Sequence, residues 1–407
     1  MTATVTLPDE REFANDVRAF LEATLPRKGE RVRATGTSVE RGKEFQRQMF
    51  DAGFGAITWP VAYGGRDLPR RYQRLFDREL ASFQQPPRVL DIGLGMVGPA
   101  IATHGTHEQK LAFLPPLLRG DHVWCELFSE PGSGSDLASV QMRATRDGDE
   151  WVLHGQKVWT SGAQHSDFGG CIARTDLDRT KHDGISFFLV DMRQPGVTVR
   201  PLRQMTGESH FNEVFFDDVV VPNAHLLGDV NEGWRVARTV LAHERQTLAS
   251  MGSGGGGKGG FTALVAAARD RNLLDDPTIR QRLADIRMRG MVLRHLGAYL
   301  QANAATGKGT GAEPSLVKLA MARLVQDTSS LAIELAGPAG VAWDAANGAG
   351  DRWAMQLLNA PSASLGGGTN EIVRNVIAER LLGLPREVEV DTDVPFRDVK
   401  VGTQRGG

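Results

Sequence analysis

The spacing of apolar residues divides the chain into a helical segment, a segment of strands and a second helical segment. Near the start, apolar residues recur at the spacing of one helix face: Phe13, Val17, Phe20 and Leu21. Pro8 and the two acidic residues after it are typical of a helix N-terminus. This pattern predicts an amphipathic α-helical domain over residues 1–120.

Short runs of β-forming residues follow, each bounded by Gly, Asp or Pro. They are Trp151–Leu153, Ile185–Val190, Val197–Arg200 and Val214–Val221. Runs of this length and composition are typical of strands. We therefore expect a compact antiparallel β domain over residues 121–228.

The helical period returns after Trp234. One stripe consists of Ala320, Leu324, Thr328, Leu331 and Leu335. Such stripes predict long helices packed as a bundle over residues 229–385. Residues 386–407 are charged and lack a period, so we expect an extended or partly disordered tail. The fold class predicted is α+β.

A dense run of glycines, Gly252–Gly260, lies inside the second helical segment. Glycine costs about 1 kcal/mol per helical position relative to alanine, so the run should stop a helix. Two interpretations stay open: extra room for a branched, cyclic or bulky ligand, or a plain surface loop.

Composition narrows the classes of partner. The 407 residues include 47 basic and 49 acidic side chains, and 41% are apolar. This balance favours a small-molecule ligand over nucleic acid or an anionic membrane surface. Cys125 and Cys171 are too few for a disulfide framework and indicate buried thiols in a reducing compartment. With no export signal and no apolar run near ~18 residues, we expect a cytoplasmic protein.

Three glycine- or hydroxyl-rich segments are the candidates for chemistry. Glu130–Asp136, here called the Gly/Ser loop, offers backbone N–H groups and hydroxyls to a polar ligand edge or a phosphate. Gln156–Gly162 places the indole of Trp159 beside two hydroxyls, a combination suited to covering an aromatic ring. The third segment is Gly366–Ile372. Taken singly, a tight turn and a core aromatic residue explain the first two equally well.

Taken together, the order and spacing of these segments resemble the acyl-CoA dehydrogenase family from about Pro8 to about Pro385. The resemblance implies an N-terminal α-helical domain, a middle antiparallel β domain and a C-terminal four-helix bundle. It also implies bound FAD, because no side chain accepts a hydride. The expected reaction is α,β-dehydrogenation of an acyl-CoA or a carrier-protein thioester. Electrons would pass to an electron-transfer flavoprotein or another acceptor.

The family's site residues carry over position by position. The implied FAD contacts are Phe128, Ser129, Gly134, Ser135, Trp159, Ser161, Gly337, Thr369 and Glu371. The implied substrate contacts are Ser135, Arg245 and Gly367. The hydroxyls of Ser129 and Ser161 would bond to the polar edge of the flavin, and the backbone N–H of Gly367 would bond to the thioester oxygen.

The expected base departs from the commonest family pattern. In many members a glutamate directly precedes the Gly-Thr pair of the C-terminal loop, but here that position is Gly367. A minority carries the glutamate on the first long C-terminal helix, immediately before an arginine, and this chain reads His243–Arg245 there. The resemblance thus implies that Glu244 is the catalytic base; a surface ion pair is the alternative interpretation. We assign no metal, since the helix lacks the second histidine of a His-Glu-x-x-His site.

Two further departures concern the flavin pyrophosphate. The family's Arg-x-x-Phe-Gly motif appears as Ala268–Leu274, where Arg269 or Arg271 could substitute, and its Gln-x-x-Gly-Gly motif appears as Glu334–Pro338. Both changes weaken the expectation of a four-flavin homotetramer and leave a homo- or hetero-oligomer, dimer or tetramer, open. Two other functions also stay open: a flavin monooxygenase on the same fold, and a non-catalytic subunit of a mixed tetramer.

Overall fold

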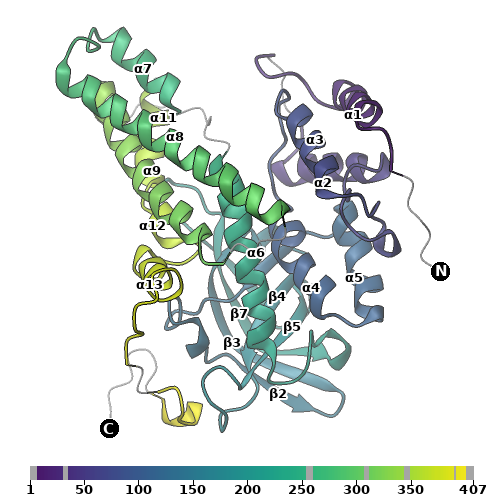
Figure 1. Ribbon diagram of the computed structural model, residues 1–407. Coiled ribbons are helices and arrows are strands. Elements are labelled where there is room, and N and C mark those ends of the chain that lie inside the picture. The colour runs from purple at the N-terminus through teal and green to yellow at the C-terminus, as the bar shows by residue number, and fades with distance from the viewer. Residues whose placement is uncertain are drawn as a thin grey trace. The chain divides into compact units, whose positions relative to one another are not determined.

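The computed structural model describes residues 7–30, 35–253, 260–306, 311–342, 349–388 and 391–399 (Figure 1). For residues 245, 246, 248–253, 304, 305 and 349–351 it describes the backbone alone. Contacts group the chain into two units. Unit 1 comprises Met1–Leu202, His210–Val240 and Asp391–Gly407, and unit 2 comprises Arg203–Ser209 and Leu241–Val390.

Unit 1 begins with helices, and side chains in the described part cap the N-termini of three of them. The helices are α1 (Glu10–Thr24), α2 (Ser38–Asp51), α3 (Arg70–Leu80), α4 (Gly98–His104) and α5 (His107–Arg119). The Asp9 carboxylate accepts from the N–H of Arg11 at 2.9 Å and caps α1. Thr106 and Gln109 form a reciprocal capping box at α5. The predicted face of α1 is confirmed: Phe13, Val17 and Leu21 are buried and Phe20 is half-buried in the same core.

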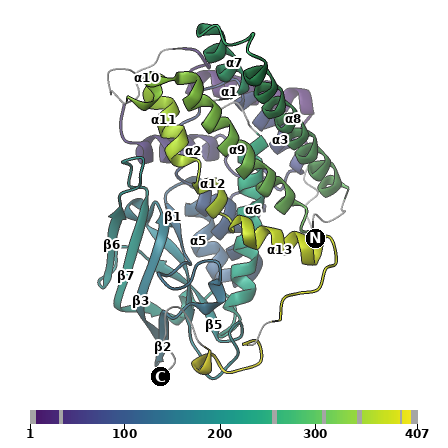
Figure 2. The same ribbon diagram turned by 90° about the vertical axis from the view of Figure 1, so that its left-hand side faces the viewer.

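The strands of unit 1 form one seven-stranded sheet. They are β1 (Trp124–Leu127), β2 (Arg143–Asp147), β3 (Glu150–Ser161), β4 (Phe168–Arg174), β5 (Ile185–Asp191), β6 (Val197–Leu202) and β7 (Phe211–Pro222). The order is β1-β4-β2-β3-β7-β6, with β5 also paired to β4 (Figure 2). The predicted antiparallel pairing is confirmed for β2–β3, β3–β7, β4–β5 and β6–β7. Two pairs are parallel, β1–β4 and β2–β4, and the sequence pattern did not reveal them.

The ladder between β3 and β7 is irregular at two places, between Leu153 and Gly155 and between Lys157 and Thr160. Gly155 has φ +146°, and a Cβ there would lie 3.0 Å from the Cα of Met142. A residue inserted into one strand re-aims the side chains around it. The second irregularity contains Trp159 and therefore sets the direction of its indole.

Both cysteines lie in the core of the sheet. Cys125 and Cys171 have no exposed surface and are free thiols. Burial raises the pKa of each thiol to about 12. The prediction of buried thiols is confirmed, and neither sulfur carries thiolate at neutral pH.

Unit 2 is helical. Its elements are α6 (Gly233–Ser253), whose first residues belong to unit 1, α7 (Phe261–Asp270), α8 (Pro277–Ala305), α9 (Pro314–Ala336), α10 (Pro338–Val341), α11 (Ala349–Asn359), α12 (Ser362–Leu365) and α13 (Asn370–Arg380). Helix α9 contacts α7, α8, α11 and α13 (Figure 2). Leu331 and Leu335 of the predicted stripe are buried, but Ala320 is exposed because Lys318 and Ala322 face inward there.

The glycine run Gly252–Gly260 is described only at its two ends. Helix α6 continues through Gly252 to Ser253, and Gly260 is the N-cap residue of α7. Residues 254–259 lie outside the described part.

The expectation of an extended or partly disordered tail is corrected for residues 391–399. Phe396 and Val399 are buried there, and a 3₁₀ turn spans Phe396–Asp398. Among the residues with described positions, no helix has the length and apolarity needed to cross a bilayer.

Candidate functional site

The two flavin-side motifs of unit 1 meet where β1 and β3 end. The N–H of Val158 donates to the carbonyl of Ser129 at 2.8 Å, which joins the two segments. Phe128 is buried, with its ring 6.0 Å from that of Phe187 in a T-shaped contact. Ser129 and Ser161 are half-buried, whereas Gly134 and Ser135 are exposed on the Gly/Ser loop. Hydroxyls and exposed backbone groups thus lie on two segments that a hydrogen bond joins.

Trp159 combines an unusual backbone with an exposed side chain. Its φ is +60°, and the indole is 62% exposed. The Phe211 ring stands nearly perpendicular to it at 6.0 Å. A positive φ costs a bulky residue about 1–2 kcal/mol, and such strain concentrates at functional sites. The sheet therefore holds a large apolar ring toward solvent, in the orientation that a planar ligand could cover.

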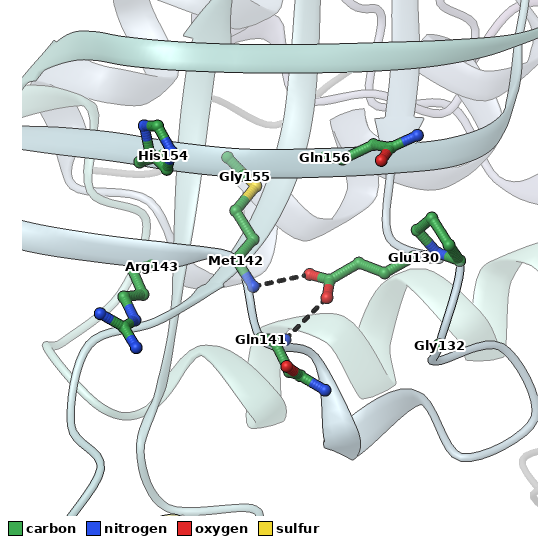
Figure 3. A pocket seen from close by; sticks show the side chains of 9 residues that line it. Glu130, Gly132, Gln141, Met142, Arg143, His154, Gly155 and Gln156 are labelled. Carbon is green, nitrogen blue, oxygen red and sulfur yellow. Dashed lines mark hydrogen bonds between the residues drawn. The ribbon is translucent and has the colours of Figure 1, made fainter. Parts of the chain in front are cut away.

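Beneath the Gly/Ser loop lies a buried ion pair that sequence analysis did not identify. The ammonium of Lys157 lies 2.8 Å from Glu130 Oε1 and donates to the Phe128 carbonyl at 3.0 Å. The Glu130 carboxylate also accepts from the N–H groups of Gln141 and Met142 at 2.7 and 3.0 Å (Figure 3). Lys157 is 0% and Glu130 8% exposed. The available signal was a lysine at an inward position of a strand.

The structure also contains an open depression of about 340 Å³ beside this ion pair (Figure 3). It is lined by Glu130, Pro131, Gly132, Gln141, Met142, Arg143, His154, Gly155 and Gln156. None of the expected FAD contacts lines it. The depression therefore borders the first residues of the Gly/Ser loop and lies apart from the predicted ligand contacts of unit 1.

In unit 2, the third motif is a glycine turn, Gly366–Thr369, that leads into α13. Gly367 and Gly368 have φ of +66° and +93°, values that favour glycine. Thr369 then caps α13 by accepting from the N–H of Ile372 at 3.3 Å. The turn thus presents backbone groups and a capping hydroxyl, and it carries no carboxylate before Thr369.

Two charged residues, Lys318 and Glu371, lie next to the glycine turn. Lys318 is 7% exposed, and its ammonium donates to Asn370 Oδ1 at 3.2 Å and to the Ser364 carbonyl at 3.4 Å. Burial lowers the pKa of Lys318, and the charge of Glu371 opposes this effect. Glu371 is exposed and lies 3.2 Å from Arg374. The pKa of Glu371 is lowered, chiefly by a bond from its own backbone N–H.

The two altered pyrophosphate motifs lie together. The guanidinium of Arg271 donates to the Ala336 carbonyl, and a Cβ at Gly337 would lie 2.4 Å from Arg271 Nη1. Gly337 has φ +58°, a conformation that favours glycine, and a side chain there would also displace the Arg271 guanidinium. Glu334 forms an ion pair with Arg282. Arg271, one of the two arginines considered as substitutes, therefore lies next to Gly337, and its role toward a pyrophosphate stays a prediction.

The expected base lies on α6. The side chain of Glu244 is half-buried, as is that of its neighbour His243. The side chain of Arg245 lies outside the described part. Neither the base assignment nor the substrate contacts are tested by these observations, and they stay predictions.

One group in the described part has metal-ligand spacing, with ligand atoms of His154, Asp217 and Asp218 all within 4.8 Å of one another. All three side chains are exposed, and exposed acidic groups are common without an ion. The expectation of no metal stays a prediction.

Comparison with known proteins identifies the class. Models of the acyl-CoA dehydrogenase N-terminal, middle and C-terminal domains match residues 8–121, 125–219 and 231–382. The chain therefore belongs to the acyl-CoA dehydrogenase family, oxidoreductases that act on CH–CH groups. The predicted family and fold class are confirmed. FAD is the family's cofactor, and the exposed Trp159 and the Gly/Ser loop provide the kind of surface that it needs.

Two relatives and one solved structure show how similar this chain is to known members of the family. Acyl-CoA dehydrogenase FadE34 of Mycobacterium tuberculosis is 41% identical over 345 residues, 84% of this chain but 46% of FadE34, so this chain spans about half of that relative. Acyl-CoA dehydrogenase IpdE1 of the same organism is 36% identical, over 94% of this chain and 100% of IpdE1. The solved structure of the Tcur3481-Tcur3483 steroid ACAD superposes with a TM-score of 0.78 at 30% identity, covering 95% of this chain and 100% of that one.

Proposed function

We propose that the chain is an FAD-dependent dehydrogenase that forms an α,β-unsaturated acyl thioester, with Glu244 as the base. The observation that carries this proposal is the half-buried position of Glu244 on α6, combined with a glycine turn that lacks the commoner glutamate. A partly buried carboxylate is a better base than a fully solvated one, because desolvation disfavours its charged form.

Each part of the proposed reaction depends on a particular group. FAD, when bound, supplies the hydride acceptor that no side chain provides. Trp159 covers an aromatic ring, and Ser129 and Ser161 offer hydroxyls to its polar edge. Glu244 takes the proton from the carbon next to the thioester carbonyl. The N–H of Gly367 donates to the carbonyl oxygen as negative charge develops there, which is worth most in a site shielded from water.

The remaining FAD and substrate contacts keep supporting roles in this proposal. Gly134 and Ser135 offer exposed N–H groups and a hydroxyl to the ligands. Thr369 and Glu371 belong to the first turn of α13, and Arg245 follows the base on α6. Gly337 with Arg271 replaces the usual pyrophosphate contact, since a guanidinium binds phosphate oxygens well.

For the substrate we propose a CoA thioester with a ring-bearing or otherwise bulky acyl group; a carrier-protein thioester is the alternative. The support is the similarity to a protein described as a steroid ACAD, at 30% identity over 95% of this chain. Electrons would leave through an electron-transfer flavoprotein or another acceptor.

We further propose that the chain works as an oligomer, and a mixed one is favoured. Helix α8 exposes Met288, Val292 and Tyr299, which recur along one stripe and leave an apolar face in water. The altered motifs at Arg271 and Glu334 favour a subunit arrangement unlike the four-flavin homotetramer. A solved structure titled ChsE4-ChsE5 complex, from Mycobacterium tuberculosis, superposes with a TM-score of 0.74 at 28% identity over 95% of this chain. The same observations keep a non-catalytic subunit as the second candidate.

An anaerobic titration tests the function. We expect the purified chain, alone or with its partner subunit, to bind FAD and to lose the oxidised flavin absorbance when it receives steroid side-chain acyl-CoAs. Glu244→Gln should keep the flavin and slow its reduction at least about a hundredfold, the usual contribution of a general base. Glu232→Gln, which changes an exposed carboxylate just before α6, is the control. Undiminished reduction in Glu244→Gln would overturn the base assignment.

A further inference from the structure

The segment Asp391–Val399, here called the docked segment, packs within unit 1 against residues that are distant from it in sequence. Phe396 and Val399 are buried, next to Leu177 and Val394. Its backbone is also bonded: the N–H of Phe396 donates to the Arg179 carbonyl at 2.8 Å, and that of Arg397 to the Leu177 carbonyl at 3.0 Å. Two buried side chains and two main-chain bonds define a specific contact.

Phe396 covers a buried cation. The guanidinium carbon of Arg174 lies 3.6 Å from the centre of the Phe396 ring, and Arg174 is 2% exposed. The same guanidinium donates to the carbonyls of Ala138 at 2.6 Å and Val140 at 3.4 Å, and to that of Lys181 at 2.8 Å. Arg174 therefore joins the docked segment to the residues that directly follow the Gly/Ser loop. Without the ring, water would compete for these hydrogen bonds.

Lys181 makes a second connection. Its ammonium, on a side chain that is 11% exposed, donates to Asp136 Oδ2 at 2.7 Å and to Asp391 Oδ2 at 3.1 Å. Asp136 is the last residue of the Gly/Ser loop, and its carbonyl accepts from the Ser133 hydroxyl at 2.6 Å. One cation thus links the docked segment directly to the loop that carries Gly134 and Ser135.

We propose that the docked segment is a latch that holds the Gly/Ser loop in its ligand-binding conformation, through Phe396 on Arg174 and through Asp391 on Lys181. The ligand part of this proposal rests on the proposed function, in which Gly134 and Ser135 contact the ligands. Phe396 and Asp391 are positioning residues, since they act through Arg174 and Lys181. A loop held by one buried and one largely buried cation is ordered before the ligand arrives, so the free-energy cost of ordering it on binding is smaller.

Hydrogen exchange in the full-length chain tests the latch without any ligand. In Phe396→Ala we expect the hydrogen-bonded amides within residues 132–139, those of Ser133 and Ser139, to exchange about tenfold faster, while the β3–β7 ladder keeps its protection. Asp391→Asn, which keeps the ring and weakens the second connection, should give a smaller change of about threefold in the same amides. Asp393→Asn alters an exposed acid of the same segment and is the matched control. Asp391→Asn also decides the matter if Phe396→Ala does not fold.

Flavin affinity tests the consequence. We expect the FAD dissociation constant of Phe396→Ala to rise about tenfold, the equivalent of 1.4 kcal/mol. Faster exchange across residues 391–399 with no change in residues 132–139 would overturn the latch. A loosened loop with unchanged FAD affinity would overturn its positioning role. If no variant or wild type binds FAD, the proposed function fails, and the exchange data still decide whether the segment holds the loop.

Discussion

The Gly/Ser loop of unit 1 and the glycine turn of unit 2 are each supported by a buried lysine, but the two lysines have different partners. Lys157 faces the carboxylate of Glu130, which two backbone N–H groups also satisfy. Lys318 donates hydrogen bonds to neutral oxygens, from Ser364 and Asn370. The charge of Glu371 acts on Lys318 without a direct ion pair among the contacts of the described residues. Accordingly, burial lowers the pKa of Lys318. An ion pair fixes a buried charge in the structure, whereas a buried charge among dipoles is more easily neutralised.

The two segments also differ in backbone conformation, and here the glycine turn is the more constrained one. Gly134 of the Gly/Ser loop has no atom within 4 Å of the position where a Cβ would lie and no positive φ. Gly367 and Gly368 of the glycine turn have φ of +66° and +93°. One segment is therefore held by side-chain charge, and the other by backbone conformations that favour glycine.

Removing Lys157 should have the largest effect on stability. Lys157→Met leaves the Glu130 carboxylate buried without its cation, and we expect the free energy of unfolding to fall by about 3–5 kcal/mol, measured by urea unfolding. The double variant with Glu130→Gln should recover part of this loss, because no charge is then left unpaired. Lys318→Met strands only neutral oxygens and should cost about 1–3 kcal/mol. Equal losses in the two lysine variants would contradict the comparison.

For glycine substitutions, the larger loss of stability should fall in the glycine turn and the smaller one in the Gly/Ser loop. Gly368→Ala forces an alanine to φ +93° and should cost about 1–2 kcal/mol in the free energy of unfolding. Gly134→Ala should be neutral or slightly stabilising, since nothing obstructs its methyl group. Gly366→Ala, at φ −65° in the same turn, controls for position. Thermal melts of the three variants measure the difference, and a neutral Gly368→Ala would refute the backbone argument.

The cap at the end of the glycine turn should contribute less. Thr369→Ala removes the hydroxyl that accepts from the Ile372 N–H, and we expect a loss of about 1 kcal/mol in the free energy of unfolding. Thr369→Ser keeps an accepting oxygen and should restore most of it. If the serine variant loses as much as the alanine variant, methyl packing and not capping is responsible.

The pH dependence of Lys318 should give the smallest effect. Its pKa is lowered from 10.5 in the folded chain, so the unfolded chain binds more protons between the lowered pKa and 10.5. Stability therefore rises with pH through this window, and below it the contribution is constant. The free energy of unfolding, measured with urea from neutral pH to 10.5, should rise less steeply with pH for Lys318→Met than for wild type. Identical slopes would show that Lys318 does not titrate there.

Sequence pattern was sufficient where structure depends on near neighbours. The spacing of Phe13, Val17 and Leu21 predicted a helix face, and the run Ile185–Val190 predicted a strand that is now part of β5. The order of the motifs indicated the family, and the bond from the Val158 N–H to the Ser129 carbonyl joins two of these motifs. Family resemblance, not periodicity, supplied the roles of the individual residues.

Sequence pattern was insufficient where partners are distant along the chain. The parallel pairing of β1 with β4 joins Trp124 to Phe168, and no local signal encodes it. The Lys157–Glu130 pair depends on the register of an irregular strand, although both residues belong to recognised motifs. The docking of Phe396 onto Arg174 crosses more than half of the chain, so a charged, aperiodic tail could not reveal it.

The depth of Cys125 and Cys171 has a practical consequence for labelling chemistry. With both thiols buried and their pKa raised to about 12, neither should react with a maleimide while the fold is intact. A cysteine introduced by Gly134→Cys would then be the single reactive thiol of the chain. A fluorophore or spin label could be attached to the Gly/Ser loop in one step, with both native cysteines left in place.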